Sequence, residues 1–100
     1  MARMSDDAAA SFPALRAFLG AYFHQDFDLD GDVEEIMARF RAEAPSAGRR
    51  QLKQDIARFL HRHRDDPDAA FAEIFHPAVD PAGGWGMTTL DWLRWIERLA

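Results

Sequence analysis

Apolar residues recur along this chain at spacings of three and four positions, and polar residues fill the positions between them. This spacing gives a helix one apolar face and therefore predicts amphipathic helices. We find no segment with the two-residue alternation of a half-buried strand. The pattern predicts an all-α fold, a compact single-domain bundle of about five helices joined by short loops. We expect these helices near residues 12–23, 33–44, 49–63, 67–75 and 89–99.

Local signals set the ends of the expected helices. Asp32, followed three residues later by Glu35, is a capping-box pattern with aspartate in place of serine or threonine. Asp66 precedes a proline and predicts another helix start, because proline fits the first turn of a helix. The stretches 45–48 and 77–86 are rich in proline and glycine, so we expect a turn and a loop there.

The chain has the size and composition of one folded domain. It has 100 residues, of which 48% are hydrophobic, and it contains no cysteine. A chain of this length buries enough surface to fold without disulfides. We expect residues 1–10 to form a disordered N-terminal tail and residues 11–100 to form the single helical domain. Asp6 and Asp7 stand where a signal peptide would be apolar, which predicts a cytoplasmic protein.

Charge is distributed unevenly around a formal net charge of −5. Residues 26–38 contain six acidic residues and no basic residue, whereas residues 39–64 contain eight basic and two acidic residues. The acidic segment is suited to attract a basic partner. The basic segment leaves a nucleic-acid-binding accessory protein as an alternative. Its basic residues in and just after the expected third helix are Arg49, Arg50, Lys53, Arg58, Arg62 and Arg64.

The acidic segment also contains half of a calcium-binding motif. Asp26, Asp28, Asp30 and Gly31 match the first half of an EF-hand loop. The twelfth position of such a loop needs a bidentate carboxylate, but Met37 occupies it here. A calcium-binding, EF-hand-like helical module of low affinity is therefore a second alternative. The other interpretations are that these acids cap the next helix and are solvated, or that they form a negative patch for a basic partner.

No set of residues predicts catalysis or a metal site. The sequence has no nucleophile elbow, phosphate-binding loop or Rossmann glycine pattern. His61 and His63 are two positions apart, so a helix directs them to different faces. His24 and Asp26 form an acid–base pair only by residue type. We therefore predict a binding protein that is not an enzyme and holds no cofactor.

Trp85 is the candidate aromatic contact. It stands among Gly83, Gly84 and Gly86, in a segment that we expect to be a flexible turn. Exposed tryptophans are frequent hot spots of protein interfaces, which favours a role as a partner anchor. The equal alternative is that the ring closes over one end of the core, where we also place Trp92.

Two short motifs resemble those of a known family. They are Tyr22-Phe23-His24-Gln25-Asp26-Phe27 with the following Asp28-Leu29-Asp30-Gly31-Asp32, and Thr88-Thr89-Leu90-Asp91-Trp92-Leu93. They resemble the immunity proteins of bacterial contact-dependent growth inhibition systems, in which tryptophan commonly stands in place of Phe27. The resemblance implies a small helical protein that binds the toxin domain of a sibling cell's surface effector and blocks it in the cytoplasm. Many such toxins are nucleases, so it also implies a basic protein partner.

The resemblance and the charge pattern lead to one functional hypothesis, an immunity protein that neutralises a cognate toxin domain, for example a nuclease. We expect Tyr22, His24 and Asp26 to hold the turn between the first two helices. The residues that we expect to bind the partner are Asp28, Asp30, Asp32, Glu34, Glu35 and Trp85.

Overall fold

The computed structural model describes residues 10–23, 32–77 and 79–100. Within these ranges the chain forms six helices and no strand, which confirms the all-α prediction. The helices are α2 (Pro13–Tyr22), α3 (Val33–Glu43), α4 (Ser46–Arg62), α5 (Pro67–Phe75), α6 (Pro81–Trp85) and α7 (Thr89–Leu99). Apart from Ala10, the tail predicted for residues 1–10 lies outside the described residues. None of the described helices has the length and apolarity needed to cross a membrane.

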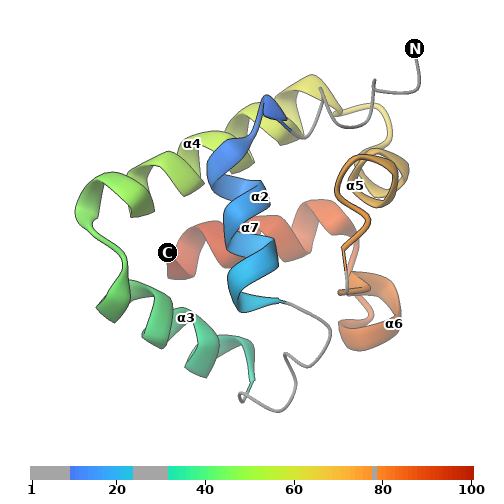
Figure 1. The fold of residues 1–100 in the computed structure, drawn as a ribbon. Helices are drawn as coiled ribbons and strands as arrows, with labels where there is room; N and C mark the ends of the chain where they lie inside the picture. The colour runs from blue at the N-terminus through green and yellow to red at the C-terminus, as the bar shows by residue number, and fades with distance from the viewer. Residues whose placement is uncertain (1–9, 24–31, 78) are drawn as a thin grey trace.

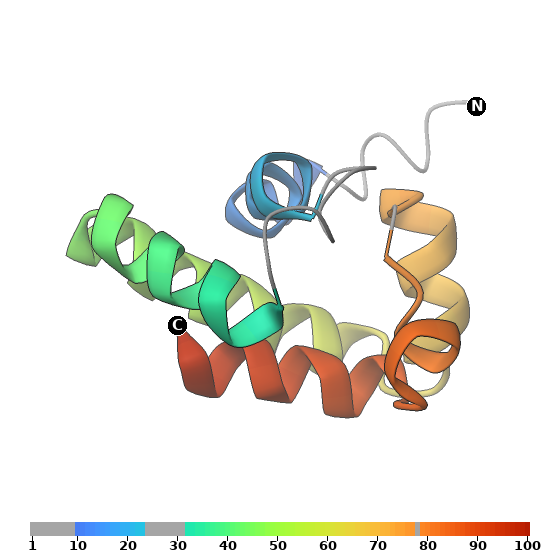
Figure 2. The ribbon, with the colours of Figure 1, turned by 90° about the horizontal axis from the view of Figure 1, so that it is seen from below.

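The C-terminal helix α7 is the element against which most others pack. It contacts α3, α4, α5 and α6, while α2 packs against α4. Figure 1 shows α2 crossing in front of α7, and the turned view in Figure 2 shows α2 nearly end-on above α7. The two helices therefore lie on opposite sides of the core and run across one another.

The core consists of the helix faces that the apolar pattern predicted. Leu15, Ile56, Met37 and Trp92 have no exposed surface, although they come from four different helices. The rings of Phe23 and Trp92 meet edge to face, with their centroids 5.1 Å apart. Since Phe23 directly follows α2, this contact fixes the end of α2 against α7. Some residues of the same pattern are only half-buried, namely Ile74, Phe75, Trp95 and Leu99.

A buried carboxylate from α4 caps the start of α2. Phe12, the N-cap residue of α2, makes no side-chain cap hydrogen bond. Asp55 Oδ2 instead accepts the N–H of Ala14 at 2.8 Å and the N–H of Leu15 at 3.1 Å. Its Oδ1 accepts a hydrogen bond from Arg58 at 2.6 Å. The N–H groups that a helix start leaves without partners are thus satisfied by another helix.

The turn predicted for residues 45–48 is shorter than expected. α4 begins at Ser46, so only Pro45 of this stretch lies outside the helix. Ala44 and Pro45 both have extended backbone conformations, with ψ of 137° and 161°, and these two residues redirect the chain between α3 and α4. Gly48 is tolerated in the first turn of α4, because that turn has few helical hydrogen bonds to lose.

The loop predicted for residues 77–86 contains the sixth helix, α6. Its first residue is Pro81, which is buried, and its last is Trp85, whose ring packs against Trp92. The loop prediction was wrong here because these contacts outweigh the weak helix propensity of Gly83 and Gly84.

Candidate functional site

The start of α3 carries three of the residues predicted to bind the partner: Asp32, Glu34 and Glu35. The Glu35 N–H donates to Asp32 Oδ1 at 2.8 Å, and the Asp32 N–H donates to Glu35 Oε1 at 3.2 Å. This reciprocal pair is the capping box that the sequence predicted. Both residues are exposed, so their carboxylates hold the helix start while they face solvent.

Glu34 differs from its two neighbours because it takes no part in the capping box. It lies in the first turn of α3 and is exposed. Carboxylates at this position interact favourably with the positive end of the helix dipole. The first turn of α3 is therefore an acidic surface held in place by its own hydrogen bonds. Asp28 and Asp30, the other acids predicted to bind the partner, lie outside the described residues.

Tyr22, predicted to hold the turn between the first two helices, joins α2 to the far end of α3. Its hydroxyl donates to Glu43 Oε1 at 2.6 Å, and the Arg39 guanidinium lies over its ring, 5.3 Å from the centroid. The hydrogen bond to Glu43 and partial burial raise the pKa of Tyr22 above its ordinary value of 10.0, although Arg39 opposes the shift. His24 and Asp26, predicted for the same role, lie outside the described residues.

Trp85, the predicted aromatic anchor, ends α6 and is half-buried. Its ring centroid lies 5.6 Å from that of Trp92. The expected flexible turn is therefore a helix, and Gly83 and Gly84 lie inside it. Because one side of the ring packs against the core, only part of its surface is available to a partner.

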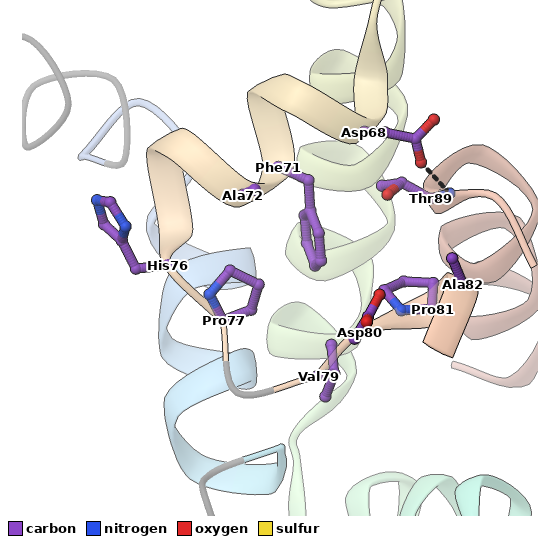
Figure 3. Close-up of a pocket in the computed structure, with 10 residues that line it drawn as sticks. All are labelled: Asp68, Phe71, Ala72, His76, Pro77, Val79, Asp80, Pro81, Ala82 and Thr89. Carbon is purple, nitrogen blue, oxygen red and sulfur yellow. Dashed lines mark hydrogen bonds between the residues drawn. The ribbon is translucent and has the colours of Figure 1, made fainter. Parts of the chain in front are cut away.

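A hollow of about 390 Å³ opens between α5, α6 and the start of α7. Figure 3 shows the Phe71 ring pointing into it and the His76 ring pointing away from it. Asp68 accepts the Thr89 N–H at 2.8 Å and thereby joins α5 to α7 at the rim (Figure 3). Asp80 adds a second carboxylate to a lining that is otherwise mostly apolar.

This hollow was not predicted from the sequence. The available signal is a repeated Asp-Pro helix start, at residues 66–67 and 80–81. Each pair indicates a local helix start. Nothing local indicates that the two helices lie side by side, because their packing depends on α7.

Within the described ranges, no group of three or more histidine, aspartate and glutamate side chains could hold a metal ion. The residues of the calcium alternative, Asp26, Asp28 and Asp30, lie outside those ranges. His61 is exposed at the end of α4, whereas His63 is half-buried with its ring centroid 5.0 Å from that of Phe59. The two histidines thus have different surroundings, as expected from their helical spacing.

The basic residues of α4 have different roles. Arg58 is exposed over 56% of its side chain, but its guanidinium is engaged in contacts within the fold, since it donates to Asp55 and to the Ser11 carbonyl. Arg49 is half-buried. The other basic residues predicted for this segment are exposed, namely Arg50, Lys53, Arg62 and Arg64.

One protein-family model matches nearly the whole length of the chain. The family model of the CdiI immunity protein matches residues 11–100, a range that contains α2 to α7 and both sequence motifs described above. No curated protein and no solved structure matches the chain. A match over this much of the chain shows the family, and the protein belongs to the CdiI immunity proteins.

Proposed function

We propose that this immunity protein neutralises a cognate contact-dependent growth inhibition toxin domain by binding it in the cytoplasm through an acidic surface. The family match over residues 11–100 carries the proposal. The surface comprises Asp32, Glu34 and Glu35 at the start of α3. From the sequence alone we also assign Asp28 and Asp30 to the partner-binding residues. The partner of this surface is a basic toxin domain such as a nuclease, because a surface that holds nucleic acid also attracts clustered carboxylates.

The charge of this surface acts mainly on the rate of encounter. Asp32, Glu34 and Glu35 face solvent, and residues 26–38 contain no basic residue that would neutralise them locally. Complementary charge speeds association and is screened by salt. Rapid association suits an inhibitor that must capture its toxin before the toxin acts.

The affinity of the complex requires buried contacts in addition to charge. Trp85 supplies one such contact through the part of its ring that Trp92 does not cover. α3 and α6 both pack against α7, so the acidic turn and Trp85 are carried by the same supporting helix.

Glu34→Gln is the sharpest test of the acidic surface, because Glu34 takes no part in the capping box. We expect this variant to associate about threefold more slowly at low salt with its cognate toxin domain. We also expect a weaker dependence of its association rate on salt. Stopped-flow fluorescence measures both quantities.

Glu73→Gln is the matched control, since Glu73 is an exposed glutamate on α5 and its substitution removes the same charge. It should associate at the parental rate. Equal slowing of both variants would show that only net charge matters. An unchanged rate for Glu34→Gln would place the interface elsewhere.

A further inference from the structure

We infer that a second surface, a pocket between the end of α4 and the start of α7, binds an acidic protein segment that carries an apolar side chain. We call it the α4–α7 pocket, and its volume is about 360 Å³. It is independent of the acidic surface proposed above. Its apolar part includes Leu60, Pro67 and Leu90, and its polar part is His61, Arg64 and Arg94.

Leu90 gives the pocket an exposed apolar side chain. Among the described residues, Leu90 is the one large hydrophobic residue that is exposed, with 40% of its surface accessible to solvent. It lies in the first turn of α7 but outside the buried stripe of that helix, which includes Trp92 and Ile96. A lone exposed leucine is unremarkable, but one that borders an apolar hollow provides a continuous contact surface for a partner.

The rim of the pocket is cationic, and none of the described residues that line it is acidic. Arg64 donates through one guanidinium nitrogen to the His61 carbonyl at 3.1 Å, which leaves its other donors for a ligand. Arg94 forms a long ion pair with Glu97, with Nη1 3.8 Å from Oε1, and its side chain is 57% exposed, so it keeps guanidinium donors for a ligand. Two guanidinium groups beside one pocket are well suited to bind carboxylates.

The lining favours an acidic protein segment over a nucleic acid. Bases of single-stranded nucleic acid bind by stacking on aromatic side chains, and His61 is the only aromatic ring in the described lining. A phosphate chain would use Arg64 and Arg94 but leave Leu90 without a contact. A segment with a leucine between acidic residues uses both parts of the pocket.

The probe for this surface is the acetylated and amidated peptide EDLDE, titrated into isotope-labelled full chain and followed by NMR. We expect the largest chemical-shift changes at the Leu90 methyl groups and at the Arg64 and Arg94 side chains. Arg64→Gln/Arg94→Gln should weaken binding about tenfold, because two charge-assisted contacts are removed. The uncharged peptide QNLNQ should bind more weakly by a similar factor.

Arg50→Gln/Arg98→Gln is the matched control, since it removes one exposed arginine from α4, the helix that Arg64 closely follows, and one from α7, and neither lines the pocket. It should bind EDLDE within about twofold of the parent chain. Equal weakening in this control would overturn the proposal. So would the absence of shifts at about 5 mM peptide, or tighter binding of a hexanucleotide RNA at the same residues.

Discussion

Asp55 shows how much one side chain contributes to this fold. It is a charged residue with only 5% of its surface exposed, and its two oxygens serve two N–H groups of α2 and the Arg58 guanidinium. Arg58 also donates to the Ser11 carbonyl at 2.8 Å and lies over the Phe12 ring, 5.3 Å from its centroid. This pair therefore ties the start of α2 to α4 by polar and aromatic contacts together.

We predict that Asp55→Ala lowers the free energy of unfolding by about 3 kcal/mol, because it leaves two N–H groups at the start of α2 without an acceptor. Urea denaturation followed by circular dichroism measures the change. Asp55→Asn keeps one side-chain oxygen that can accept a hydrogen bond, so the free energy of unfolding should fall by less in this variant. Equal losses in the two variants would show that the carboxylate charge, and not the cap, is what matters.

Tyr22 gives a prediction at high pH. It is the one tyrosine of the chain, so its titration by ultraviolet absorbance is unambiguous. The bond to Glu43 raises its pKa in the folded state above 10.0, so the associated stability is present below pH 10.0 and is lost as the pH rises through the folded-state pKa. Glu43→Gln should lower the measured pKa toward 10.0. An unchanged titration curve in that variant would remove Glu43 as the cause.

At the scale of single elements, residues at its two ends stabilise the short helix α6. Pro81 begins the helix and is buried, and Trp85 ends it against Trp92. Gly86 follows with a left-handed backbone, φ 65°, and its N–H donates to the Ala82 carbonyl at 3.0 Å. A residue with a side chain rarely adopts that conformation, so glycine stops the helix at this position.

Two alanine substitutions in and after α6 should have opposite effects. Gly84→Ala should stabilise the protein by about 0.5 kcal/mol, because a Cβ there meets no atom within 4 Å and alanine favours the helix. Gly86→Ala should destabilise it by about 1 kcal/mol because of its positive φ. Thermal unfolding measures the change in stability of each variant. Stability changes of the same sign in both would contradict the helical assignment of α6.

At the scale of the whole molecule, Trp92 connects four helices. It lies on α7, fully buried, and its ring faces Phe23 after α2, Phe71 on α5 and Trp85 on α6 at centroid distances of 5.1, 6.2 and 5.6 Å. Among the described residues, none accepts a hydrogen bond from the buried Nε1–H of Trp92. The aromatic contacts hold this ring in place, so we expect its size to be the property that matters most for stability.

We predict that Trp92→Ala lowers the free energy of unfolding by about 4 kcal/mol, a large share of the stability of a small domain. Trp95→Ala on the same helix is the matched control. Because Trp95 is only half-buried, this substitution should lower the free energy of unfolding clearly less. Chemical denaturation followed by far-ultraviolet circular dichroism compares the two. Similar losses would show that Trp92 is not the centre of the core.

The candidate surfaces were predictable to different degrees. The acidic start of α3 was accessible from the sequence, because the capping box and the charge cluster both lie within a few neighbouring residues. For Trp85 the sequence left two equal interpretations, a partner anchor and a ring that closes over one end of the core, because its burial depends on the contact with Trp92 on another helix. The α4–α7 pocket was missed for the same reason, because Leu60 and Leu90 are brought together only when α4 packs against α7.

The sequence by itself determined the helical class and most helix starts, because capping residues and apolar periodicity act over three or four positions. Asp32, Asp66 and Thr88 each cap a helix through an N–H three residues further along the chain. Only the tertiary structure decided that Asp55 caps a helix 41 positions away, that residues 81–85 are helical, and that Arg64, just after α4, and Arg94 of α7 line the same pocket. These features depend on contacts between distant segments, whose free energy exists only once the helices have packed together.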